Sequence, residues 1–306
     1  MKKVFTRSVA ALALGVSIAL AFSGCGSQTP AKQDTTEKIK VVASFDAMKE
    51  ITQAIGGNKV DVTTIIPEGI EPHDYELKTS DVQKLQEAKL FVYNGLGMEA
   101  WADKAIQTAS ADNLMSVALA EHLQPIELTD PEEIEEHGAY DPHAWLGLTS
   151  AKEEASAVKD ALIKISPEDK EYFEKNYMAF ADEIDKMQEE YMKKVANATR
   201  KEIVTGHAAF GYLCRDLGIS QESVEDVFAS GEPSAQKLAE LTDFCKAHNV
   251  KIIFTEDLVS PAVSETLAKE AGAKAEAIHT IESAEDGMTY LARMKDNLNK
   301  IAEALM

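Results

Sequence analysis

Apolar residues recur along this chain in two periods that alternate with each other. Short runs rich in apolar and β-branched residues predict strands, and segments with an apolar residue every three or four positions predict amphipathic helices. The predicted strands are residues 39–43, 60–66, 90–93, 203–205, 250–255 and 275–278. Because strands that alternate with helices form parallel sheets, the pattern predicts an α/β fold in which helices flank mostly parallel sheets.

The longest predicted helix begins after Ser166, which is a good N-cap residue and is followed by Pro167 at the first helical position. Its apolar positions are Phe173, Tyr177, Phe180, Ile184, Met187 and Tyr191. A helix of about 30 residues would be about 45 Å long, which is more than one small domain needs. We therefore expect it to join two lobes. The predicted domains are an N-terminal α/β lobe over residues 38–160, a linking helix over 161–200 and a C-terminal α/β lobe over 201–306.

The first residues have the pattern of an export signal. Lys2, Lys3 and Arg7 precede an uncharged apolar stretch that ends just before Cys25. Small residues followed by cysteine resemble the lipobox of bacterial lipoproteins. We therefore expect a signal peptide over residues 1–24, a lipid on Cys25 and a polar tether over 25–37. This predicts a protein anchored by lipid to the extracytoplasmic face of the cell membrane.

Charge and cysteine content exclude several classes of function. Without residues 1–24 the chain has 28 basic and 52 acidic residues, a net charge of -24, so nucleic acid is not expected as a partner. The three cysteines, Cys25, Cys214 and Cys245, have no CxxC spacing, which excludes a cysteine-based zinc or redox motif. Two alternatives stay open for Cys214 and Cys245: a disulfide in the second lobe, or two buried free thiols.

Four of the seven histidines share one setting. His73, His143, His207 and His279 each follow a predicted strand or lie in a loop of marked character. Loops beyond the carboxyl ends of parallel strands form the ligand site of open α/β sheets. Two of these histidines would come from each lobe, which predicts a site in the cleft between lobes. Imidazole suits zinc and other transition metals. Each histidine taken alone is an ordinary polar residue, and only the set of four indicates a metal site.

A further histidine, His137, lies in the acidic segment 130–142, which we expect to be a solvated loop. It could bind metal there only weakly.

Several segments resemble the metal-binding lipoproteins of zinc and manganese ABC importers, over essentially the whole mature chain. They are residues 72–76 around His73, residues 141–146 around His143, residues 206–212 around His207, residues 231–234 and residues 254–256. The resemblance implies two lobes joined by a rigid helix and three histidine ligands, His73, His143 and His207. It also implies an ABC permease and its ATPase as partners, and we expect a monomer.

The resemblance implies a fourth ligand in the last lobe, where many members have an aspartate. This chain has His279 there, so we extend the ligand role to His279, with Glu282, Glu276 or water as alternatives. Four histidines would form a nitrogen-only set, which favours Zn2+ over Mn2+ as the transported ion. The alternatives are a manganese importer component or a metal-binding surface adhesin. A zinc hydrolase is disfavoured because the chain has no HExxH motif and four protein ligands would close the site, so we expect no enzyme.

The lipid anchor gives the first testable prediction. Replacing Cys25 with Ala removes the only expected acylation site, so we expect the protein to leave the membrane fraction and to incorporate no labelled fatty acid. Fractionation and acyl labelling of cells that express the parent and the Cys25→Ala variant measure this. Unchanged acylation of the variant would end the assignment.

Overall fold

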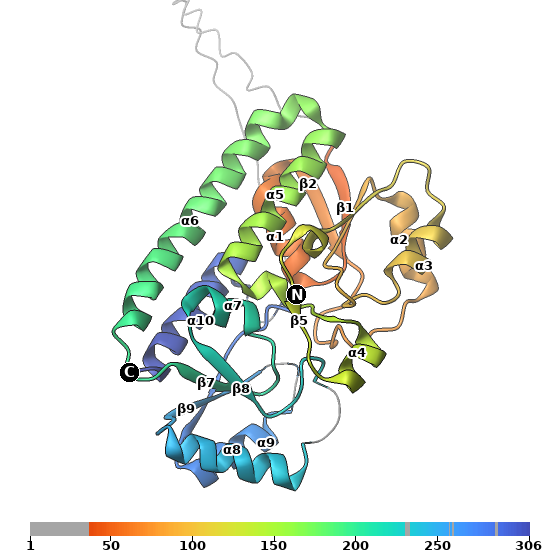
Figure 1. Cartoon of the computed structure of the whole chain (residues 1–306). Helices are drawn as coiled ribbons and strands as arrows, with labels where there is room; N and C mark the ends of the chain where they lie inside the picture. Colours follow the sequence, from red (N-terminus) through yellow and green to blue (C-terminus); the bar gives the residue numbers. More distant parts are fainter. Residues whose placement is uncertain (1–36, 230–232, 257, 259, 285–286) are drawn as a thin grey trace, which may run out of the picture. The chain divides into compact units, whose positions relative to one another are not determined.

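Parallel strands form the centre of both lobes of this α/β protein (Figure 1). The computed structural model describes residues 37–229, 233–256, 258, 260–284 and 287–306, and Glu37–Met306 group into one unit by their contacts. The predicted fold class is therefore confirmed. The bounds predicted for the two lobes and the linking helix stay a prediction.

The first lobe contains a four-stranded sheet in the order β2-β1-β3-β4, with every neighbouring pair parallel. Its strands are β1 (Ile39–Ala43), β2 (Val60–Thr64), β3 (Leu90–Tyr93) and β4 (Met115–Ala118). Its helices are α1 (Asp46–Gly56), α2 (Thr79–Glu87), α3 (Ala102–Ala109) and α5 (Leu148–Ile165). Helices α1 and α5 pack together on one side of the sheet, and α2 and α3 pack together on the other (Figure 1). The half-buried strand β4 was not predicted, because its short segment has no apolar run.

The second lobe contains two parallel strand pairs, β7 with β8 and β9 with β10. Its strands are β7 (Glu202–Thr205), β8 (Ser220–Ser223), β9 (Ile252–Thr255) and β10 (Lys274–Ala277). Its helices are α7 (Gly211–Leu217), α8 (Ala235–Ala247), α9 (Ala262–Ala271) and α10 (Tyr290–Ala304). Strand β7 lies beside β9, and α8 packs against α9. The loops that follow β7 and β10 both belong to this lobe.

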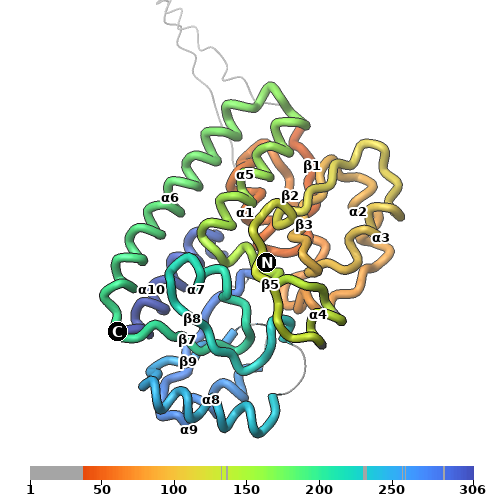
Figure 2. Tube along the Cα trace, viewed as in Figure 1, coloured from red at the N-terminus to blue at the C-terminus, as the bar shows by residue number. Residues whose placement is uncertain are grey.

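Helix α6 (Lys170–Ala196) has 27 residues and contacts helices of both lobes, as its trace in Figure 2 shows. Near its start, the amide of Asn176 donates a hydrogen bond to the Ile55 carbonyl at the end of α1, at 2.8 Å. Near its end, the hydroxyl of Tyr191 bonds to Asn299 of α10. Its buried side chains are Phe173, Phe180, Ile184, Met187, Tyr191 and Val195, which recur at the predicted spacing. A helix about 40 Å long thus supports both lobes.

The remaining elements are short. They are η1 (Gly57–Lys59), η2 (Leu119–His122), β5 (Ile126–Glu127), α4 (Pro131–His137), β6 (Tyr140–Asp141), η3 (Ala144–Leu146) and η4 (Pro167–Asp169). The expectation that residues 130–142 form a loop was wrong, because this segment contains α4 and β6. Pro131 suits the first helical position, and the Asp130 carbonyl accepts a hydrogen bond from the Ile134 amide at 3.1 Å, which starts the helix.

The export segment and Cys25 lie outside the described residues. Among the residues that the structure does describe, no helix combines the length and the apolar character needed to cross a membrane.

Cys214 and Cys245 are both buried free thiols in the structure, so it does not contain the disulfide that was one of the two alternatives. The reason is that they pack into different clusters. Cys214 of α7 joins the main core, and Cys245 of α8 joins a separate cluster with Val204 and Ile253.

These thiols are expected to be unreactive until the protein unfolds. Burial raises the pKa of Cys214 to about 12 and the pKa of Cys245 to about 11, so almost no thiolate is present at pH 8. In a Cys25→Ala variant kept free of reductant, a thiol reagent should therefore detect no fast-reacting thiol in the native state. After denaturation it should detect two per chain. Finding none after denaturation would show that the disulfide forms.

Candidate metal centre

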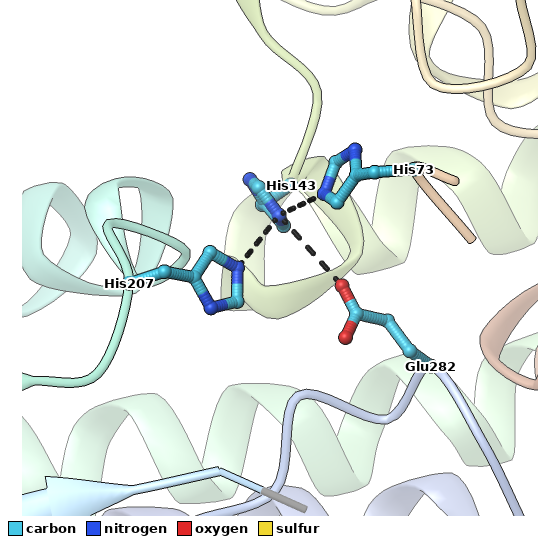
Figure 3. A group of neighbouring side chains, drawn as sticks. All are labelled: His73, His143, His207 and Glu282. Carbon is cyan, nitrogen blue, oxygen red and sulfur yellow. Dashed lines mark hydrogen bonds and ion pairs between the residues drawn. The ribbon is translucent and has the colours of Figure 1, made fainter. Parts of the chain in front are cut away.

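Four side chains from both lobes converge on one point, as Figure 3 shows. They are His73, His143, His207 and Glu282, and their ligand atoms all lie within 4.8 Å of one another. Each belongs to a loop next to a strand: His73 follows β2, His143 follows β6, His207 follows β7 and Glu282 follows β10. Three of these loops leave the carboxyl ends of parallel strands, as the fold predicts, whereas β6 belongs to an antiparallel pair with β5.

The distances between these atoms suit a tetrahedral ion. The Nε2 atom of His143 lies 3.2 Å from the Nε2 atoms of both His73 and His207, and 3.7 Å from Oε1 of Glu282. Bonds of about 2.0–2.1 Å to a tetrahedral Zn2+ place neighbouring ligand nitrogens about 3.3 Å apart. The single lone pair of His143 Nε2 can accept only one hydrogen bond from the two rings beside it. A cation at the shared point would satisfy all the rings at once.

Asp141 orients the His143 ring. Its Oδ1 atom lies 2.9 Å from the ring Nδ1 and accepts a hydrogen bond of the same length from the His143 amide. Burial lowers the pKa of His143 well below its usual value, so the ring is neutral, and it raises the pKa of Asp141 to about 7. The acceptor at Nδ1 assigns the ring proton to that nitrogen and leaves the Nε2 lone pair directed at the site.

Glu256 orients the His207 ring in the same way. Its Oε1 accepts a hydrogen bond from the His207 amide at 3.1 Å, and its Oε2 pairs with Nδ1 of the ring. Burial acts to lower the pKa of His207, but the carboxylates of Glu256, Glu282 and Glu71 outweigh burial and raise it to about 9. At pH 7 the ring without metal is therefore protonated, and a proton occupies the position that an ion would take.

His73 is the most accessible of the three rings. Its backbone amide donates a hydrogen bond to Glu71 Oε1 at 3.3 Å, and its ring contacts Phe228 with a centroid distance of 5.3 Å. Burial and the neighbouring rings of His143 and His207 lower its pKa well below the usual value. The ring is therefore neutral at pH 7 and has a nitrogen available for a ligand bond.

Glu282 supplies the oxygen of the site. Its Oε2 accepts a hydrogen bond from the Thr280 hydroxyl at 2.6 Å, whereas its buried Oε1 has no hydrogen-bond partner among the described residues. Burial raises the pKa of Glu282 to about 8. Because a buried acceptor without a partner is rare and destabilising, this atom fits a ligand to a cation. The residues present therefore fit a divalent transition metal.

The structure does not bring His279 into this cluster. Its Nε2 lies 3.2 Å from Asp296 Oδ2 on α10, and Asn297 bonds to its backbone amide and carbonyl. The nitrogen-only ligand set that favoured zinc is therefore not the set that the structure assembles. Glu276, another alternative, pairs with Lys274 on β10 at 2.8 Å. His137 also lies outside the cluster and stacks on Phe228 at a centroid distance of 4.0 Å.

Asp141 and Glu256 are not among the site residues predicted from the sequence. Each had a local signal, because Asp141 lies two residues before His143 and Glu256 directly follows the last residue of β9. Histidines that bind metal commonly donate their second ring proton to such a carboxylate.

The fold and the site together define a two-lobed metal-binding protein of the solute-binding class. The chain matches the family ZnuA, described as "Zinc-uptake complex component A periplasmic", over residues 41–304. It belongs to this family, which confirms the resemblance found in the sequence. The family is one of uptake components.

Individual relatives are similar over nearly the whole chain. A putative metal-binding protein of Treponema pallidum is 38% identical and covers 97% of this chain and 95% of its own. The high-affinity zinc uptake system protein ZnuA of Bacillus subtilis is 36% identical, with 94% of each chain covered. Among solved structures, the laminin-binding protein of Streptococcus agalactiae, described as a bifunctional protein with adhesin and metal transporting activity, has a TM-score of 0.80. It is 32% identical and covers 88% of this chain and 100% of its own.

The protonation of His207 gives a pH prediction. Because its pKa is raised to about 9 and that of Glu282 to about 8, zinc at pH 7 has to displace protons from the site. We expect about one to two protons released per ion, and an apparent affinity that falls about tenfold or more per unit as the pH drops below 7. Calorimetry in buffers of different ionisation enthalpy measures the release. An observed enthalpy that does not depend on the buffer would contradict it.

Proposed function

We propose that this protein captures Zn2+ outside the cytoplasmic membrane and delivers it to an ABC permease that a cytoplasmic ATPase powers. In this proposal the ligands are the Nε2 atoms of His73, His143 and His207 and Oε1 of Glu282. The observation that carries the proposal is the convergence of these four atoms from loops of both lobes. A site shared by two lobes can open or close around a cargo when the lobes move.

The ligand chemistry favours zinc over manganese. Three imidazole nitrogens and one carboxylate oxygen at tetrahedral separations suit Zn2+, whereas Mn2+ prefers oxygen ligands, and nitrogen sites bind zinc more tightly. The oxygen of Glu282 is a ligand that manganese also accepts, so the preference rests on the three histidines. The names of the relatives agree: the Bacillus subtilis protein is a zinc uptake protein, and AdcA of Streptococcus pyogenes is a zinc-binding protein.

The arrangement also favours binding over catalysis. A catalytic zinc site keeps one coordination position open for water or substrate. Here four protein atoms would fill a tetrahedral coordination sphere, and three of the four side chains are buried. Such a site holds an ion without exposing it to a substrate, which suits a carrier.

Anchoring through Cys25 places the carrier beside its permease. The support is the lipobox-like sequence before Cys25, together with the relative AdcA of Streptococcus pneumoniae, which is named a zinc-binding lipoprotein. In this proposal the protein is a monomer on the extracytoplasmic face of the membrane, and a polar tether joins it to the lipid anchor.

Single alanine variants test the ligand set. Replacing His73, His143, His207 or Glu282 should each weaken zinc affinity by more than the roughly 10–100-fold that loss of an outer partner costs. His279→Ala and His137→Ala are matched controls and should bind zinc like the parent. Competition against a chromophoric chelator measures the affinities. Parent-like binding by His207→Ala, or a large loss in His279→Ala, would overturn the ligand assignment.

Growth of a deletion strain tests the transported ion. The strain should stop growing under zinc chelation and recover with added zinc or with the plasmid-borne parent gene. The Glu282→Ala gene should restore growth less well than the parent. Recovery with manganese alone would overturn the zinc assignment.

A further inference from the structure

We propose that Trp145 is a positioning residue for the metal site: its indole N–H holds the loop that carries Glu282, and so sets how well the fourth ligand meets the ion. The proposal rests on the proposed function, in which Glu282 is that ligand. It assigns to this tryptophan a role in affinity and in coordination geometry beyond filling the core.

Trp145 connects the two lobes beside the site. It is fully buried in η3, two residues after His143, and its ring lies 5.1 Å from the His143 ring. Its Nε1 donates a hydrogen bond of 2.7 Å to the carbonyl of Thr280, which is 135 residues later in the chain. One side chain therefore joins the segment of a first-lobe ligand to the loop of the second-lobe ligand.

The loop after β10 has a conformation that needs support. Ile281 has a φ of +60° and is fully buried. A β-branched residue rarely adopts this left-handed backbone, and such strain persists only where the surroundings hold it. The turn at Ile281 separates His279, which faces Asp296, from Glu282, which faces the three histidines.

Hydrogen bonds hold this turn from both sides. Asn297 accepts from the His279 amide at 2.9 Å and donates to the His279 carbonyl at 2.7 Å. Trp145 then holds the Thr280 carbonyl. Beyond the turn, the Gly69 amide of the first lobe donates to Ser283 Oγ at 2.8 Å. One hydrogen bond between the lobes therefore lies before Glu282 and another lies after it. The bond before it is donated by the side chain of Trp145, so a substitution can remove it.

Thr280 passes this constraint to the ligand. Its carbonyl is held by Trp145, and its hydroxyl donates to Oε2 of Glu282 at 2.6 Å. The other carboxylate oxygen, Oε1, is left for the ion, 3.7 Å from His143 Nε2. Loss of the indole donor would leave the buried Thr280 carbonyl without this partner, and the strained turn could then relax and move Glu282.

The test is Trp145→Phe, which keeps an aromatic ring in the core but removes the N–H donor. We expect zinc affinity to fall about 10–100-fold, as for other outer partners of metal ligands. In Co2+-loaded protein, the visible absorption of the four-coordinate ion should shift towards that of the Glu282→Ala variant. The matched control is Trp101→Phe, because the Nε1 of Trp101 has no hydrogen-bond partner among the described residues. This control should change neither the affinity nor the spectrum.

A double-mutant cycle separates positioning from a general effect on packing. If Trp145 acts through Glu282, the loss caused by Trp145→Phe should shrink to less than about threefold in a Glu282→Ala background. Thr280→Val, which removes only the hydroxyl donor, should behave in the same way as Trp145→Phe. If Trp145→Phe does not fold, Trp145→Leu takes its place, because it also lacks the N–H donor to the Thr280 carbonyl.

The outcomes distinguish this inference from the proposed function. If Glu282→Ala binds zinc like the parent, the proposed ligand set itself is wrong. If Glu282→Ala weakens binding but Trp145→Phe and Thr280→Val bind like the parent, the positioning role is wrong and the ligand set stands. The positioning role is also wrong if the loss in Trp145→Phe is equally large with and without Glu282.

Discussion

The rest of this structure depends on one constraint: buried polar ligand atoms of His73, His143, His207 and Glu282 are held close together. Asp141 and Glu256 each hold the Nδ1 atom of a histidine, which directs the Nε2 atoms of His143 and His207 at a common point. Glu282 adds a buried oxygen without a hydrogen-bond partner among the described residues. Such a group is unfavourable in a low-dielectric interior unless a positive charge is present. Without metal, the pKa values of about 9 for His207 and about 8 for Glu282 leave protons on both groups at pH 7, and an ion would replace these protons.

The arrangement of strands and helices keeps these buried polar groups together although their burial is unfavourable. Strand β2 of the first lobe's sheet leads to the loop of His73, and β7 and β10 of the second lobe lead to the loops of His207 and Glu282. Helix α6 bonds to α1 at one end and to α10 at the other, so it limits how far the lobes separate. Trp145, whose ring lies beside that of His143, joins the lobes through its hydrogen bond to the Thr280 carbonyl. Rigid elements thus carry the loops, and the loops carry the ligands.

The sequence predicted the parts of this account that follow from local pattern. Short runs rich in apolar residues predicted β1, β3 and β9, and the apolar spacing from Phe173 to Tyr191 predicted α6. The settings of His73, His143 and His207 indicated one site. The sequence pattern could not predict the direction in which a side chain points within a loop. His279 and Glu282 are three residues apart, and the left-handed turn at Ile281 decides which of them faces the histidines. A positive φ at an isoleucine has no sequence signal, so the sequence pointed to His279, whereas the structure places Glu282 beside the three histidines.

The same limit explains the other differences. Whether Cys214 and Cys245 meet depends on how α7 and α8 pack, which their spacing does not determine. The orienting roles of Asp141 and Glu256 depend on which ring nitrogens they reach, and this requires the assembled site.

A crystal structure of the zinc-loaded protein, with the ion located by its anomalous scattering, tests the central claim most directly. The account predicts one ion bound by Nε2 of His73, His143 and His207 at about 2.0–2.1 Å and by Oε1 of Glu282 at about 2.0–2.2 Å, with His279 still beside Asp296. An ion bound by His279, or bound away from these three histidines, would contradict it.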